Sequence, residues 1–257
     1  VKAASNFPEL LSNEQLKRSI QSSHSELQIL GTEIISNRQI SDLLPCIIEN
    51  LKNTDIYRAS ISALHNFSSE TVEFIIMDKL EENSNSIDKS TVKLIEALGE
   101  FGSDKSVDLL IHLIYEKTDT VVDAILMSFN KIIVEANISK IQFKQLEKFL
   151  QGRLKYAYMK LYYIYTIQSL NSYDLLLDHF QVEFNKEVKR IFIILGILYR
   201  DTMAKSYTYK LQSSDRSVIS NVLEIIESQY PDKIKQVLMP LIDETSIEEK
   251  LNSGEVF

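Results

Sequence analysis

The stretch that decides the fold is Thr91-Val-Lys-Leu-Ile-Glu-Ala-Leu-Gly99, followed by Glu100-Phe-Gly-Ser-Asp-Lys-Ser-Val-Asp-Leu-Leu-Ile-His-Leu-Ile114. It predicts an apolar helix, a short turn rich in Gly, Ser and Asp, and a second apolar helix. The apolar residues from Val107 to Ile114 recur at i, i+3, i+4 and i+7, which places them on one stripe of the second helix. Because such a stripe must be covered by neighbouring helices, the segment predicts a helix pair that packs against other pairs.

The same pattern recurs along the chain. One apolar residue near the end of each first helix marks the copies, and successive markers are about 28 to 35 residues apart, as in paired-helix repeats. The markers are Ile35, Leu64, Leu98, Phe129, Ile164, Leu198 and Ile226. We therefore expect a single domain over residues 1–257, with about seven helix pairs and a frayed acidic tail at residues 244–257. The predicted pairs cover residues 24–53, 54–84, 86–117, 118–151, 153–184, 186–212 and 215–243.

Composition supports an all-α protein. Only six Gly and four Pro in 257 residues leave too few turn residues for a many-stranded sandwich or barrel. Within the predicted first helices, Gly31, Gly99 and Gly196 indicate close approach of a neighbouring helix, since glycine there costs about 1 kcal/mol of helix propensity.

The cysteine count and the hydropathy pattern bear on the cellular compartment of the protein. A single cysteine, Cys46, excludes an internal disulfide framework and a Cys-based zinc site. No segment approaches the roughly 18 consecutive apolar residues of a membrane-spanning helix, and the N-terminus lacks a signal-peptide pattern. We expect a cytoplasmic protein. Because the chain begins at Val1 rather than Met, we also expect it to be a module of a larger protein.

The repeated pattern resembles the HEAT-repeat family. Ala97-Leu98-Gly99 matches the Ala-Leu-Gly of that family's first helix, and residues 43–48 are similar to the Leu-Pro-x-Leu-Leu stretch of its second helix. In other copies Ser36, His65 and Asn130 stand in place of the glycine. The resemblance covers roughly residues 7–243 and implies an α-α superhelix, a HEAT-like solenoid built from stacked helix pairs.

A second, more local resemblance lies in residues 191–243. Their apolar runs look like the soluble HEAT module that follows the membrane part of some bacterial nucleotide-carrier-like transporter proteins. This resemblance implies a cytoplasmic regulatory domain tethered to a membrane domain.

Charge is unevenly distributed along the chain. The formal net charge is −8, yet residues 136–216 carry 13 Lys and Arg against 7 Asp and Glu, while both flanking segments are acidic. Because non-specific nucleic-acid binding needs a coherent basic surface, we expect no nucleic-acid partner for the chain as a whole. The basic segment is the one candidate for binding an anionic partner.

The basic segment supplies the candidate partner-binding residues. Lys140, Lys144 and Lys148 recur every four residues and so share a helix face. Second helices line the inner surface of a HEAT stack, so these lysines would form a cationic stripe there; Lys160 follows in the next repeat. Nine of the twelve tyrosines lie between residues 156 and 209. The predicted residues are Lys140, Lys144, Lys148, Arg153, Lys155, Tyr156, Lys186, Lys189 and Arg190.

Two interpretations of this segment remain open. The tyrosines could fill gaps between repeats with their hydroxyls in water, and the lysines could form an ordinary solvated face. If the segment binds, its partner is a protein or acidic peptide, an anionic membrane surface, a linked membrane domain or a phosphorylated ligand.

Catalytic motifs are lacking in the sequence. The four histidines, in different predicted copies, show no metal-ligand spacing, and no glycine-rich phosphate loop occurs. We therefore expect no enzyme activity, no cofactor and no metal. The leading hypothesis is a non-catalytic protein-interaction scaffold, with the transporter-tethered regulatory domain as the alternative. A HEAT-like DNA glycosylase is a further alternative, disfavoured by the net charge of −8 and the absence of Trp.

Overall fold

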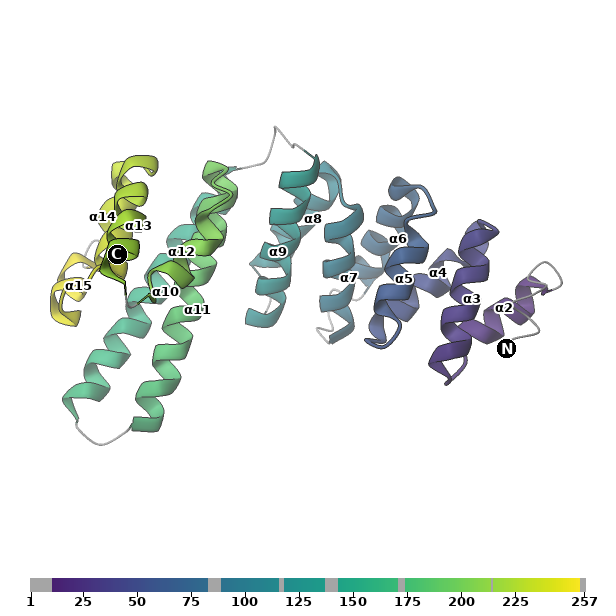
Figure 1. Cartoon of the computed structure of the whole chain (residues 1–257), viewed down its shortest axis with the longest axis horizontal. Coiled ribbons are helices and arrows are strands. Elements are labelled where there is room, and N and C mark those ends of the chain that lie inside the picture. Colours follow the sequence, from purple (N-terminus) through teal and green to yellow (C-terminus); the bar gives the residue numbers. More distant parts are fainter. Residues whose placement is uncertain are drawn as a thin grey trace. The chain divides into compact units, whose positions relative to one another are not determined.

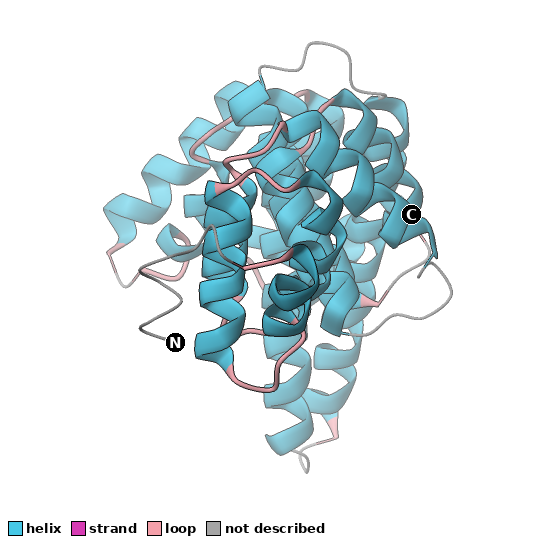
Figure 2. Ribbon diagram, turned by 90° about the vertical axis from the view of Figure 1, so that its right-hand side faces the viewer, coloured by secondary structure: helices cyan, strands magenta, loops and turns pink. Residues whose placement is uncertain are grey.

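The chain is all-α in the part that the computed structural model describes, residues 11–82, 89–115, 118–136, 143–170, 174–213 and 215–254. These residues form helices joined by turns, with no strand among them (Figures 1 and 2). The predicted helical class is therefore confirmed. The chain divides into two compact units, residues 1–141 and 142–257, where the sequence predicts one domain without a break.

Unit 1 is a succession of short helices in the order that the sequence predicts. Three predicted pairs correspond to α3 with α4, α5 with α6 and α7 with α8. The elements are α2 (Asn13–Ile20), α3 (Ser25–Asn37), η2 (Ser41–Leu43), α4 (Leu44–Glu49), η3 (Asn50–Lys52), α5 (Tyr57–Leu64), α6 (Ser69–Glu82), α7 (Lys89–Phe101), α8 (Asp104–Ile114) and α9 (Asp119–Ala136).

Neighbouring pairs in unit 1 pack in chain order. α3 packs on α5, α6 on α7, and α9 on both α7 and α8. The predicted stripe is buried, because Val107, Leu110, Ile111 and Ile114 of α8 are all at most 3% exposed. Each helix therefore places one apolar face against the helices before and after it.

Polar contacts between successive pairs repeat at the predicted step. The Ser36 hydroxyl donates to the Ala63 carbonyl 27 residues away at 3.0 Å, and Lys79 donates to Glu49, 30 residues away, at 3.1 Å. The Ser128 hydroxyl donates to the Ile95 carbonyl, 33 residues away, at 2.7 Å. Ser36 is 2% exposed, so its hydroxyl is a buried link between α3 and α5.

Unit 2 is built on two long helices. These are α10 (Phe143–Ser169) and α11 (Asp174–Tyr199), which pack along each other as an antiparallel hairpin (Figure 1). The shorter helices pack against the hairpin and one another. They are α12 (Ala204–Lys210), α13 (Arg216–Gln229), α14 (Asp232–Ile242) and α15 (Ile247–Ser253).

The long helices correct the predicted repeat borders. Breaks were expected at residues 151–153 and 184–186, but α10 and α11 continue through both positions. In α10, the buried residues Leu150, Leu154 and Ala157 keep the helical spacing across Gly152. In α11, Phe184, Val188 and Ile191 do the same across the polar residues 185–187. The prediction was wrong because isolated polar and glycine residues do not end a helix whose apolar stripe continues.

The predicted acidic tail is also corrected. Residues 247–253 form α15, whose N-terminus carries a capping box between Ser246 and Glu249. The Lys250 ammonium donates to the Asp243 carbonyl at 2.7 Å, and α15 packs on α10 and α14. These local hydrogen bonds order a segment that net charge alone suggested would fray.

Candidate functional site

Three of the predicted lysines share an exposed face of α10. Lys144, Lys148 and Lys155 are exposed, and their spacing of four and seven residues keeps them on one side of the helix. Tyr162, another seven residues on, is 55% exposed. The sequence placed Lys148 and Lys155 on different helices, and the continuous α10 instead aligns them.

Beside this face, cations and aromatic rings alternate. The Lys160 ammonium lies 4.9 Å from the centroid of the Tyr156 ring and 5.4 Å from that of Phe180 on α11. The Tyr163 and Phe180 rings are 5.1 Å apart. Cation–π contacts of this kind hold the Lys160 ammonium beside the two rings. We call Lys144, Lys148, Lys155, Tyr156, Lys160 and Tyr162 the hairpin surface.

Two predicted cations do not belong to this surface. Arg190 is 2% exposed and ion-pairs with the buried carboxylate of Glu187. Arg153, whose side chain is 18% exposed, donates to both Glu187 carboxylate oxygens at 3.3 Å. A cation engaged with a fully buried carboxylate is held in the helix interface. The structure therefore does not place Arg153 and Arg190 on the predicted partner-binding surface, because Arg153 joins α10 to Glu187 of α11 and Arg190 pairs with Glu187 within α11.

The two predicted lysines of α11 lie elsewhere. Lys186 and Lys189 line a depression of about 250 Å³ with Val182 of α11 and Tyr209 of α12. Lys186 also donates to Glu183 at 2.7 Å, and this hydrogen bond, aided by Lys160, lowers the pKa of Glu183. The structure therefore divides the predicted set between two surfaces. Lys140 lies outside the described residues.

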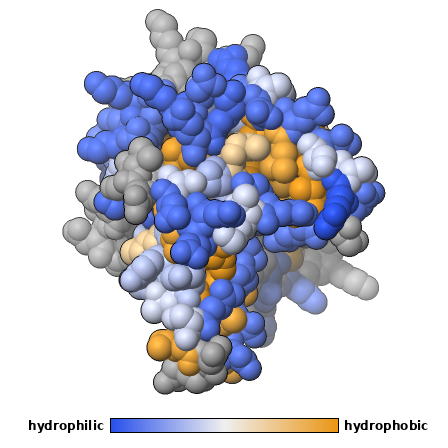
Figure 3. All heavy atoms as spheres, turned by 90° about the vertical axis from the view of Figure 1, so that its left-hand side faces the viewer, coloured by the Kyte–Doolittle hydropathy of each residue, from blue (hydrophilic) through white to orange (hydrophobic). Residues whose placement is uncertain are grey.

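Unit 2 also exposes apolar side chains toward the free end of the hairpin. Leu170 is 59% exposed and Leu175 is 88% exposed. Figure 3 shows orange side chains among hydrophilic ones at this projecting end, at the bottom of the view. The hairpin thus combines exposed cations along α10 with exposed apolar groups near its end.

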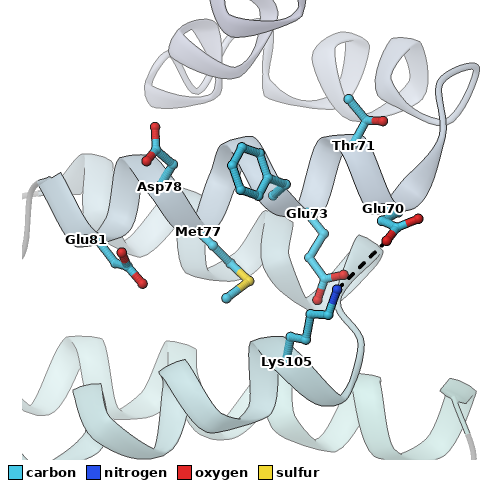
Figure 4. Close-up of a pocket in the computed structure, with 8 residues that line it drawn as sticks. Glu70, Thr71, Glu73, Met77, Asp78, Glu81 and Lys105 are labelled. Carbon is cyan, nitrogen blue, oxygen red and sulfur yellow. Dashed lines mark ion pairs between the residues drawn. The ribbon is translucent and has the colours of Figure 1, made fainter.

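A recess in unit 1 was missed by the sequence analysis. It has a volume of about 390 Å³ and lies between α6 and α8, lined by Glu70, Phe74, Met77, Asp78, Glu81 and Lys105 among others. In Figure 4, Met77 points from α6 toward α8, and Lys105 extends from α8 toward Glu70. A signal was available, because Phe74 falls outside the stripe formed by Val72, Ile76 and Leu80, which are buried. We call these six residues the acidic recess.

Glu73 lines the same recess but has a structural partner. Its Oε1 accepts from the Ser103 backbone N–H at 2.8 Å, from the Ser103 hydroxyl at 2.7 Å and from the Ser106 hydroxyl. Ser103 is the N-cap of α8. Glu73 is 5% exposed, so α6 supplies a buried cap to the N-terminus of α8.

The described residues show neither a metal-binding cluster nor a membrane-spanning helix. Among them, no group of three or more His, Cys, Asp and Glu side chains is placed to hold a metal ion. None of the described helices combines the length and the apolar character needed to cross a membrane. No protein-family model, curated protein or solved structure matches the chain.

Proposed function

We propose that the chain is a non-catalytic protein-interaction scaffold of the HEAT-repeat type, and that the hairpin surface binds an acidic segment of a partner protein. The observation that carries this proposal is the arrangement of α10. Its three aligned lysines and Tyr162 face solvent, while Arg153 and Arg190 are held inside the hairpin by Glu187.

The repeat-type scaffold is supported by the spacing of the contacts between successive helix pairs. Side-chain hydrogen bonds join residues 27, 30 and 33 positions apart in unit 1. Repeat proteins bury each unit against its sequence neighbours and present a long surface of ordered helices. A rigid helix surface needs little ordering on binding, which favours recognition of extended partners.

The chemistry of the hairpin surface favours an acidic partner. Residues 143–169 carry five Lys and Arg and one acidic residue, Glu147. Exposed lysines attract anionic groups from a distance, with an attraction that salt screens within about 8 to 10 Å. Tyr156 and Tyr162 add flat amphipathic rings of the kind that is enriched at protein interfaces. An acidic peptide with a few apolar residues matches both features.

The test is a binding titration of the whole chain. The probe is a fluorescein-labelled peptide containing Glu-Asp-Glu-Phe three times, and the signal is fluorescence polarisation. We expect Lys148→Glu/Lys155→Glu to weaken binding by at least about tenfold, because two attractive charges become repulsive. The matched control is Lys205→Glu/Arg216→Glu, which makes the same change in net charge at exposed residues of α12 and α13.

Three outcomes decide the proposal. Equal losses in the two double variants would mean that only net charge matters and would reject the hairpin surface. Undetectable binding of the peptide by the native chain would also reject it. The third measurement is co-sedimentation of the chain with vesicles of phosphatidylcholine containing one-third phosphatidylserine. If the chain sediments with these vesicles but does not bind the acidic peptide, the partner of the hairpin surface is an anionic membrane and not a protein.

A further inference from the structure

The acidic recess of unit 1 has the features of a second binding site. Phe74 of α6 is 69% exposed, although phenylalanine is normally buried in a folded core. Met77 lies one helical turn further and also lines the recess. An exposed aromatic side chain beside a thioether, within a hollow, is an apolar contact surface of the kind that anchors a partner side chain.

Charged groups border this apolar floor. Asp78 and Glu81 are exposed, and neither forms an ion pair with another described residue. The single lysine in the lining, Lys105, lies 3.8 Å from Glu70, with both side chains more than 70% exposed. Such an exposed pair is weak, and it does not involve Asp78 or Glu81, which place two carboxylates in the lining of the recess.

The spacing of these groups on α6 defines what would fit. Phe74, Met77, Asp78 and Glu81 stand at i, i+3, i+4 and i+7, so apolar and anionic groups lie along one face of the helix. A complementary ligand presents an apolar side chain to Phe74 and Met77 and a cation, about one helical turn away, to Asp78 and Glu81.

We propose that the acidic recess binds a basic amphipathic segment of a partner protein, in which Leu or Phe alternates with Lys or Arg at helical spacing. The segment places its apolar face on Phe74 and Met77 and its cations beside Asp78 and Glu81. This proposal rests on the scaffold function proposed above. It gives the scaffold a second binding surface, whose charge is opposite to that of the hairpin surface. It uses none of the hairpin residues.

The experiment is a polarisation titration of the whole chain with two labelled probes. The first is a twelve-residue peptide with Lys and Arg on one helical face and Leu and Phe on the other. The second contains the same cations, with Ser in place of Leu and Phe. We expect the first probe to bind at least about tenfold more tightly than the second. Equal binding of the two probes would overturn the proposal, because it would mean that the negative charge of unit 1 attracts any cationic peptide.

Variants locate the site. We expect Phe74→Ala, and separately Asp78→Lys/Glu81→Lys, to weaken binding of the first probe by about tenfold or more. The controls are Glu33→Lys/Asp42→Lys, which alters net charge equally at exposed residues of α3 and η2, and Met127→Ala, which removes a 43% exposed apolar side chain from α9. Controls should change binding less than about twofold; equal losses in controls and recess variants would overturn the proposal.

The acidic peptide that probes the hairpin surface is titrated against the same variants. If that peptide binds normally while the basic amphipathic probe does not bind, the recess proposal fails and the hairpin proposal stands. A wild-type chain that forms dimers or larger oligomers in sedimentation, with Asp78→Lys/Glu81→Lys monomeric, would assign the recess to the basic face of a second copy. That result would contradict the proposal that a separate protein binds the recess.

Discussion

Arg153 of α10 donates to both carboxylate oxygens of Glu187 on α11, at 3.3 Å each. Glu187 is fully buried and also ion-pairs with Arg190. One carboxylate therefore pairs with two guanidinium groups in the hairpin. Removing one member of such a network leaves a desolvated charge without its partner.

We expect Glu187→Ala to lower the free energy of unfolding of unit 2 by about 3 to 5 kcal/mol, because Arg190 would remain buried without its carboxylate. Asp178→Ala, at an exposed position of α11, should change it by less than about 0.5 kcal/mol. The chain has no Trp, and nine of its twelve tyrosines lie between residues 156 and 209. Urea unfolding followed by tyrosine fluorescence therefore reports mainly on unit 2.

A double variant separates the buried charge from the lost contact. Glu187→Leu/Arg190→Leu removes both charges and should be less destabilised than Glu187→Leu, because the buried guanidinium that loses the Glu187 carboxylate in the single variant is also removed. A double variant as unstable as the single one would mean that packing, rather than charge, determines the cost.

The sequence could not assign Arg153 and Arg190 correctly, because a lysine-rich or arginine-rich segment looks the same whether its cations face solvent or a buried acid. The missing information was the position of Glu187, which lies 34 residues from Arg153 and reaches it only when α10 and α11 are both continuous. The spacing of Lys144 and Lys148, in contrast, was enough to predict a shared exposed face. Helix existence followed from the apolar stripes, whereas helix ends depended on tertiary packing.

Glu73 provides the second prediction. We expect Glu73→Ala to destabilise unit 1 by about 1 to 3 kcal/mol, because the N-cap N–H of Ser103 and two serine hydroxyls lose their buried acceptor. Thermal unfolding followed by circular dichroism measures the effect. Glu81→Ala, exposed on the same helix, is the control. Equal shifts in the two variants would contradict a capping role for Glu73.

Two glycines are expected to respond in opposite ways to the same substitution. A Cβ at Gly99 of α7 would lie 3.0 Å from Ser128 Cα on α9, whereas nothing lies within 4 Å of a Cβ at Gly152. Gly99→Ala should therefore destabilise by about 1 to 3 kcal/mol through overpacking. Gly152→Ala should stabilise α10 by about 0.5 to 1 kcal/mol, because alanine loses less backbone entropy in a helix. Urea unfolding of both variants is the measurement, and a stabilised Gly99→Ala would contradict the close helix approach.

The same pair explains one success and one failure of the sequence interpretation. Glycine within a predicted apolar helix indicates close approach of a neighbouring helix, and Gly99 confirms this. Gly152 falls between the predicted pairs 118–151 and 153–184, yet it is exposed within a continuous helix. What distinguishes them is the environment of the missing Cβ, which only the neighbouring helix reveals.

Tyr158 yields a prediction about alkaline stability. Its hydroxyl donates to the Val237 carbonyl on α14 at 2.8 Å, and burial, with a smaller contribution from Asp243, raises its pKa to about 12. The folded state favours the neutral phenol. The contribution of Tyr158 to the free energy of unfolding is therefore complete below about pH 10 and is lost as the pH rises through 12. The free energy of unfolding should therefore fall over this range more steeply for the native chain than for Tyr158→Phe, which has no proton to lose at this position. At neutral pH the phenylalanine variant should be less stable by about 1 kcal/mol, the typical contribution of one hydrogen bond. Urea unfolding at several pH values tests both statements, and parallel pH profiles for the two proteins would show that the Tyr158 proton is not linked to folding.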